Sequence, residues 1–232
     1  MSVITVQNVS VAYGGRNVIE DVSFTLEEGD YLCIAGENGS GKTTLLKAIT
    51  GLLKLKNGSI KFGDGLKNNE IGYLPQQTDM QKDFPASARE VVLSGFVGSM
   101  GLRPFYTKKQ KNAADATMKR LGIFELQKKC YHELSGGQQQ KILLARAICA
   151  SGRLIVMDEP TTALDSGASE EFYSLISKLN KEGMTVVVIS HDIPGIIGYA
   201  NKVLHLGEQK PLFFGSAKDY TEKFLRKKEE LK

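Results

Sequence analysis

The segment YLCIAGENGSGKTTLLKAI, residues 31–49, decides the fold of this 232-residue chain. The apolar stretch YLCIA runs into a glycine-rich loop, and the pattern predicts a helix over residues 42–53 with an apolar face. The loop, residues 36–43, fits G-x-x-x-x-G-K-[ST] between a strand and a helix, which is the context of a phosphate-binding loop. We therefore predict a nucleotide-phosphate site rather than an ordinary glycine turn.

Each residue type in this loop has a physical reason. Glycines let the backbone wrap a phosphate so that several N–H groups point inward, and the helix start adds a favourable dipole. Lys42 is expected to reach the β- and γ-phosphates, and the Thr43 hydroxyl is expected to ligate Mg²⁺. The residues predicted to bind the nucleotide here are Gly36, Asn38, Gly39, Ser40, Gly41, Lys42, Thr43 and Thr44.

Outward from this loop, the chain shows the alternation of an α/β protein. Residues 4–13 alternate apolar and polar side chains, as a half-buried strand does. Residues 153–159 and 184–190 are apolar runs typical of strands covered on both faces in a parallel sheet, with a predicted helix at 168–182 between them. From residue 77 to residue 150 the strand patterns stop, and three helices are predicted.

Composition excludes several classes of protein. The net charge of +4 comes from 30 basic and 26 acidic residues that are scattered, which argues against nucleic acid as a partner. Cys33, Cys130 and Cys149 lack disulfide or metal-site spacing, so we expect reduced thiols in a cytosolic protein. The first twenty residues do not read as a signal peptide, and the short apolar runs do not predict a membrane-spanning chain.

A magnesium site beside the phosphate loop needs a carboxylate, and LIVMDEP, residues 154–160, supplies two at the end of a buried strand. Successive strand residues point to opposite sides, so one acid can serve the metal and the other the water. We expect Asp158 to hold Mg²⁺ through its water shell and Glu159 to polarise the attacking water. An acidic strand-to-loop junction without function is the alternative.

A second segment, HELSGGQQQK at residues 132–141, also has the chemistry of a phosphate site. Ser135 followed three residues later by Gln138 forms a capping box, which by itself would only begin a helix. Gly136 and Gly137 are poor helix formers, however, and their lack of side chains lets a phosphate approach the backbone N–H groups. The pattern favours a second phosphate site over a simple helix start.

Six motifs occur in a fixed order: GENGSGKT, YLPQ, LSGGQ, LIVMDEP, TTALD and SHD. In these motifs the chain resembles the nucleotide-binding subunits of ABC transporters over nearly its whole length. The resemblance implies an α/β fold: a P-loop NTPase (RecA-like) core with an N-terminal antiparallel β-subdomain and an inserted α-helical subdomain. It implies a single ATP-binding domain over residues 1–232, with 1–76 and 151–232 as the core and β-subdomain and 77–150 as the helical subdomain.

The resemblance also explains why one chain carries two phosphate sites. In this family two copies dimerise head to tail, and each ATP lies between the phosphate loop of one copy and the LSGGQ segment of the other. Ser135, Gly136, Gly137 and Gln138 are thus expected to bind the nucleotide of a second copy. Asp165, in TTALD, matches the family's aspartate that crosses the dimer interface.

Three further residues take roles from the resemblance. Gln76 matches the glutamine that contacts Mg²⁺ and the attacking water, although Gln77 beside it leaves the register open. His191 matches the family's γ-phosphate histidine, and Tyr13 matches the aromatic residue that stacks on adenine. The alternatives to these functional roles are a solvated loop residue for Gln76, a structural histidine for His191 and a tyrosine that only packs for Tyr13.

The family's activity is hydrolysis of ATP with Mg²⁺ by direct attack of water, which drives separate membrane permease subunits and, indirectly, a substrate-binding protein. The resemblance therefore implies a peripheral protein at the cytoplasmic face of the membrane. Residues 83–101, with DFP, EVVLSG and a later glycine, resemble the zinc and manganese importer branch. A siderophore or cobalamin importer, or a soluble ABC ATPase of assembly or maintenance, is the alternative.

Overall fold

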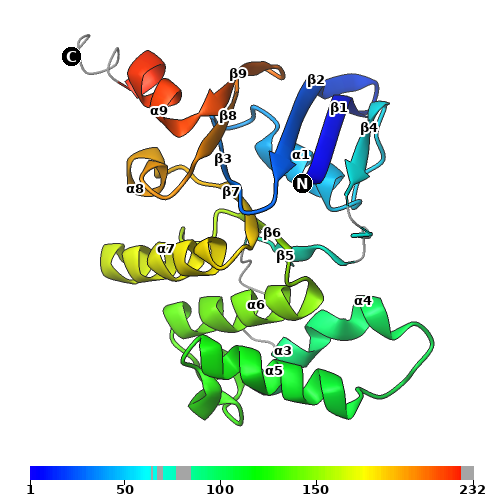
Figure 1. Ribbon diagram of the computed structural model, residues 1–232, viewed down its shortest axis with the longest axis vertical. Helices are drawn as coiled ribbons and strands as arrows, with labels where there is room; N and C mark the ends of the chain where they lie inside the picture. The colour runs from blue at the N-terminus through cyan, green and yellow to red at the C-terminus, as the bar shows by residue number, and fades with distance from the viewer. Residues whose placement is uncertain (64, 67–69, 77–84, 226–232) are drawn as a thin grey trace.

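The structure is a computed structural model that describes residues 1–63, 65–66, 70–76 and 85–225. The N-terminal part forms a small antiparallel sheet, which lies beside a larger sheet and away from the helices of residues 85–150 (Figure 1). The small sheet has the order β2-β1-β4 and consists of β1 (Ser2–Tyr13), β2 (Arg16–Glu27) and β4 (Asn57–Phe62).

The larger sheet has the order β5-β6-β7-β3-β8-β9. Its strands are β3 (Tyr31–Gly36), β5 (Gly72–Leu74), β6 (Leu154–Asp158), β7 (Thr185–Ile189), β8 (Lys202–Leu206) and β9 (Pro211–Ser216). Neighbouring strands pair in parallel except β9, which runs antiparallel to β8. All residues of β6 and β7 are buried, which is why their sequences are continuous apolar runs. The predicted α/β class is confirmed.

Two apolar cores lie on the two faces of this sheet. Leu32 and Ile34 of β3 belong to the core shared with the small sheet and with α1 (Lys42–Ile49). Tyr31 and Cys33, which alternate with them, belong to the opposite core with α7 (Ser166–Lys181). The sheet is therefore held from both sides, and the parallel strands β3, β6 and β7 end at one common edge.

In the described chain from residue 85 to residue 150, helices joined by turns and loops make up the regular structure, apart from an isolated bridge between Ser87 and Cys130. Its α-helices lie together beside α7 and away from the small sheet (Figure 1). They are α3 (Ala88–Leu93), α4 (Val97–Met100), α5 (Lys108–Arg120) and α6 (Gly136–Ala150), with 3₁₀ turns at Ser94–Phe96, Phe124–Leu126 and Tyr131–Glu133. The Arg89 side chain pairs with Asp115 at 2.7 Å and ties α3 to α5.

The predicted helix over residues 42–53 is wrong beyond Ile49. Thr50 ends α1, and its hydroxyl donates to the Leu46 carbonyl at 3.1 Å. Gly51 follows with a φ of 73°, a left-handed conformation that a helix cannot continue through.

The chain ends, as far as it is described, with α8 (Ile193–Ile197), the β8–β9 hairpin, α9 (Ala217–Tyr220) and a π-helical turn (Thr221–Leu225). Gln77 and the first two residues of DFP lie outside the described residues. In the described part of the chain, none of the helices combines the length and apolar composition that a membrane crossing needs.

Candidate active site

The phosphate loop connects the end of β3 to α1, as predicted. Gly36 and Gly41 have φ values of 146° and 95°, in the region that favours glycine. A Cβ atom on Gly36 would lie 2.4 Å from the Leu206 carbonyl oxygen, and one on Gly41 would lie 2.3 Å from Cγ2 of Ile19. Both glycines are therefore required by the packing of this chain itself.

Lys42 is held inside the loop. Its ammonium group donates to the carbonyl oxygens of Gly36 at 2.9 Å and Glu37 at 2.8 Å, and its side chain is buried. Burial lowers the pKa of Lys42, while the charges of Glu159 and Asp158 act in the opposite direction. Such a cation lacks much of its hydration and is suited to a phosphate anion.

The other predicted loop residues differ in exposure. Asn38 and Gly39 are exposed at the tip of the loop, and Thr44 is half-buried in the first turn of α1. Ser40 is buried, and its hydroxyl oxygen has no hydrogen-bond partner among the described residues. The loop therefore offers polar atoms beyond those that its own fold uses.

Thr43 and Asp158 meet at the edge where β6 ends. The Thr43 hydroxyl donates to Oδ1 of Asp158 at 3.3 Å, and Asp158 is 2% exposed. Burial raises the pKa of Asp158; the hydrogen bond from Thr43 lowers it, and the charge of Glu159 raises it further. A hydroxyl and a carboxylate oxygen side by side form a hard oxygen donor set that fits Mg²⁺.

Glu159 directly follows Asp158 and has a φ of 48°, a left-handed conformation that is uncommon outside glycine. Its backbone N–H donates to the Ile189 carbonyl at 3.1 Å. Oε2 of Glu159 accepts a bond from the Gln76 amide at 3.1 Å, and Oε1 lies 2.5 Å from Nε2 of His191. The structure thus brings Gln76, Glu159 and His191 together, from three separate strand ends.

Thr162 also reaches this carboxylate and was not singled out in the sequence. Its hydroxyl donates to Oε2 of Glu159 at 3.2 Å. Thr162 belongs to the motif TTALD, in which the sequence predicts a functional role only for Asp165. A hydroxyl three residues after the predicted base is the signal that could have identified this contact.

Ser135 begins α6 with both bonds of the predicted capping box. Its backbone N–H donates to Oε1 of Gln138 at 3.1 Å, and the Gln138 N–H donates to the Ser135 hydroxyl at 3.4 Å. A Cβ on Gly136 would be 3.6 Å from its nearest neighbour, and one on Gly137 would be 3.9 Å away, which are ordinary contacts. Among the residues that the structure describes, packing does not require either glycine.

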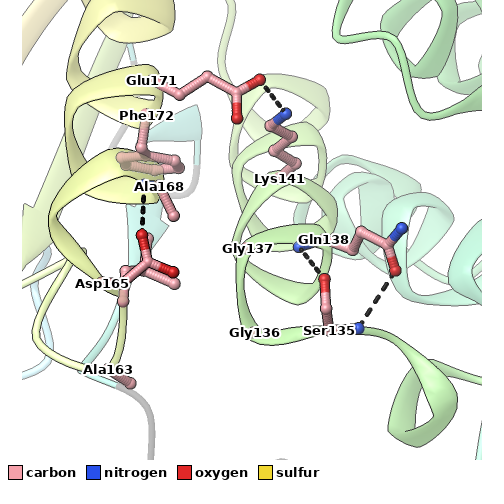
Figure 2. Close-up of a pocket in the computed structure, with 11 residues that line it drawn as sticks. Ser135, Gly136, Gly137, Gln138, Lys141, Ala163, Asp165, Ala168, Glu171 and Phe172 are labelled. Carbon is pink, nitrogen blue, oxygen red and sulfur yellow. Dashed lines mark hydrogen bonds and ion pairs between the residues drawn. The ribbon is translucent and has the colours of Figure 1, made fainter.

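The same segment faces the start of α7 across a pocket of about 310 Å³ (Figure 2). Asp165 caps α7 by accepting a bond from the Ala168 N–H at 2.8 Å. Lys141 and Glu171 form an ion pair of 2.7 Å between the two helices. Ser135, both glycines, Gln138 and Asp165 therefore line one pocket, whose polar groups come from two helix starts.

Tyr13 lies elsewhere, at the end of β1, where it pairs with Arg16 across the turn of the small sheet and is 49% exposed. Its ring is available for stacking. Among the described residues, no hydrogen bond or ion pair joins residues 36–43 to residues 135–138. Within one chain the two phosphate-type segments are separate.

The arrangement at the strand ends can perform a defined chemistry. The backbone of residues 36–43 is shaped to accept phosphates, and the hydroxyl of Thr43 beside the carboxylate of Asp158 is a donor set suited to a cation. The carboxylate of Glu159, bonded by Gln76 and Thr162, is placed to accept a proton from water. Together these groups fit hydrolysis of a nucleoside triphosphate.

Comparison with known proteins agrees with this chemistry. The family model described as ABC transporter matches residues 19–162. The chain is 36% identical to the zinc uptake system ATP-binding protein ZurA of Listeria innocua, over 94% of this chain and 87% of that protein. It is 35% identical to the manganese transport system ATP-binding protein MntB of Bacillus subtilis, over 97% and 91%.

A solved structure of a metal-chelate type ABC transporter in an inward-facing conformation is also similar. It shares 32% identity with a TM-score of 0.84, over 94% of this chain and 85% of that chain. This similarity covers 94% of the chain and so extends beyond residues 19–162 of the family model.

Proposed function

The chain belongs to the ABC transporter family and is an ATP-binding subunit that hydrolyses ATP; on that premise we propose that it drives the uptake of a divalent metal ion, zinc or manganese. The observation that carries the catalytic part is the position of the Glu159 carboxylate. It is bonded to Gln76, Thr162 and His191 and follows the Asp158–Thr43 pair directly.

In the proposed mechanism, residues 36–43 hold the phosphates of ATP, and Lys42 supplies the positive charge that faces them. Gln76 orients water, and Glu159 accepts its proton as it attacks the γ-phosphate. His191, next to Glu159, contacts the γ-phosphate. Thr43, Asp158 and Gln76 would hold Mg²⁺, which neutralises the charge that develops on the phosphate oxygens.

We propose a second copy of the chain as the partner of Ser135, Gly136, Gly137 and Gln138. The support is that these residues are half-buried or exposed, that the fold does not need the two glycines, and that Asp165 lines the same pocket. Tyr13 would stack on the adenine of the ATP bound by its own chain. The division into a core with β-subdomain (1–76 and 151–232) and a helical subdomain (77–150) belongs to this proposal.

ABC ATP-binding subunits work with membrane permease subunits. We propose that this chain is peripheral at the cytoplasmic face of the membrane through such subunits, and that a substrate-binding protein delivers the cargo. Zinc and manganese are favoured because two relatives named above carry these metals in their names. The alternative cargo is a chelated metal, because the similar solved structure is that of a metal-chelate type transporter.

Two experiments test the two halves of the proposal. Glu159→Gln keeps the shape of the side chain, so ATP binding should persist while kcat falls by about two orders of magnitude. For the cargo, cells that lack the chain are complemented with wild type or Glu159→Gln, and cellular zinc, manganese and iron are measured. The proposal is supported if the cells with Glu159→Gln contain less zinc or less manganese than the cells with wild type, at unchanged iron. It is contradicted if only the iron content falls, or if the content of none of the three metals falls.

A further inference from the structure

Three hydroxyl groups, two of them buried and one half-buried, form a hydrogen-bonded chain next to the proposed catalytic residues. The hydroxyl of Tyr173, in α7, lies 2.9 Å from Oγ1 of Thr161 and 3.1 Å from Oγ of Ser190. Tyr173 is 2% exposed and Ser190 is 4% exposed. One side chain thereby bridges the two loops that follow β6 and β7.

These two loops carry the proposed catalytic pair. Thr161 lies two residues after Glu159, and Ser190 directly precedes His191. Oε1 of Glu159 and Nε2 of His191 are themselves 2.5 Å apart. The contacts therefore close a ring that runs along the chain from Glu159 to Thr161, through the Tyr173 hydroxyl to Ser190, and on to His191. The Tyr173 bonds therefore add a side-chain link between the two loops to the backbone bond from Glu159 to Ile189.

The Tyr173 hydroxyl can serve both neighbours at once. Burial raises the pKa of Tyr173, so the group keeps its proton at neutral pH. A neutral phenol can donate one bond and accept another, as the two hydroxyls of Thr161 and Ser190 require. Ser190 also accepts a bond from the Asp192 N–H at 3.1 Å, which fixes the loop on the far side of His191.

Tyr31 provides the contrast within the same core. It is 1% exposed and belongs to the same apolar cluster as Tyr173, yet its hydroxyl has no hydrogen-bond partner among the described residues. Both rings fill space in the core. Of the two hydroxyl groups, only that of Tyr173 joins the loops that follow β6 and β7 among the described residues. A phenylalanine would fill the core at residue 173 equally well without this bridge.

We propose that Tyr173 is a positioning residue whose hydroxyl sets the placement of Glu159 relative to His191. This inference rests on the catalytic roles proposed above for those two residues. Tyr173 does not touch ATP in this account, and it acts only through Thr161 and Ser190.

The test compares Tyr173→Phe with the matched control Tyr31→Phe. Because small misplacement of catalytic groups lowers rate strongly, Tyr173→Phe should lower kcat by roughly tenfold or more and leave the KM for ATP within about twofold. Tyr31→Phe removes an unbonded hydroxyl from the same core, so its kcat should equal that of wild type. Melting temperatures measured in parallel show whether each variant is folded.

A double-mutant cycle with Ser190→Ala distinguishes the bridge from general packing. If Tyr173 acts through Ser190, the two substitutions together should lower kcat by much less than the product of their separate effects. The inference would be overturned if the loss of kcat in the double variant equalled the product of the two single losses. It would also be overturned by an unchanged kcat in folded Tyr173→Phe. Glu159→Gln assayed beside them separates the two proposals, because full activity in Glu159→Gln removes the catalytic role itself.

Discussion

The two phosphate-type segments, residues 36–43 and 135–138, share serine and glycine but differ in what makes glycine necessary. In the first segment, added Cβ atoms on Gly36 and Gly41 would collide with Leu206 and Ile19. In the second, added Cβ atoms on Gly136 and Gly137 would make only ordinary contacts. The first set of glycines is explained by this chain alone; the second is not.

The difference supports the proposal that a second copy of the chain approaches residues 135–138. A helix start that gives up helix propensity at two positions, with no steric reason in its own fold, points to close approach by something else. The segments differ in charge as well. Lys42 and Asp158 are buried at the first site, and burial shifts the pKa of each against its charged form. At the second site, Asp165 is exposed and serves as a helix cap.

The largest effect is expected from Gly41→Ala. The substitution adds a Cβ against Ile19 and the Val18 carbonyl and places alanine at a φ of 95°. Left-handed strain and overpacking together should lower the free energy of unfolding by about 2 to 4 kcal/mol. Urea denaturation measures this loss.

Gly39→Ala is the matched control for that experiment. Gly39 has a φ of 81°, but no atom of the described part of the chain lies within 4 Å of the added Cβ. Only the backbone strain remains, which costs about 1 to 2 kcal/mol. Equal losses in the two variants would contradict the steric argument for Gly41.

A smaller effect, of opposite sign, is expected from Asp158→Asn without nucleotide. Because the pKa of Asp158 is raised in the folded chain, the wild-type protein loses stability as pH rises through that folded pKa, when the buried carboxyl ionises. The asparagine side chain cannot ionise, so the variant should be more stable than wild type at pH 7. Below about pH 3.9, where both side chains are neutral, the difference should vanish.

Asp165→Asn is the control, because asparagine caps a helix about as well as aspartate. Its stability should change by only a few tenths of a kcal/mol at either pH. Thermal melts at pH 7 and at the lowest pH where the chain stays folded compare the two variants. A destabilised Asp158→Asn at pH 7 would show that the charge of Asp158 is compensated in the folded state.

A small gain in stability is expected from Gly137→Ala. Alanine is the better helix former by up to about 1 kcal/mol, and the added Cβ would lie 3.9 Å from that of Ala168. We therefore expect a slightly raised melting temperature together with reduced ATPase activity. A stabilised variant with wild-type kcat would mean that no phosphate approaches this glycine.

The sequence predicted features that are encoded locally. The phosphate loop, the Ser135–Gln138 capping box and the buried parallel strands depend on contacts within a few residues or on simple apolar runs. The end of α1 was missed because the apolar pattern continues to Leu53 whereas Thr50 and Gly51 stop the helix.

Long-range features had no such signal. Glu159 has a left-handed conformation at the point where the chain leaves β6, and no residue type in LIVMDEP predicts it. Tyr173 reads in the sequence as one apolar residue of an amphipathic helix. Its bonds to Thr161 and Ser190 depend on how α7 packs on the sheet, which residue spacing does not reveal.

ATPase activity of Ser135→Arg protein, alone and mixed with Lys42→Ala protein, tests most directly the claim that residues 135–138 serve a second copy. Ser135→Arg should bind ATP normally through residues 36–43 but hydrolyse none, because the bulky side chain blocks closure on the partner's nucleotide. In a mixed dimer, the intact phosphate loop of one variant faces the intact Ser135 segment of the other, so mixing should restore activity that neither variant shows. Pure Ser135→Arg protein that hydrolyses ATP at the wild-type rate would contradict the account.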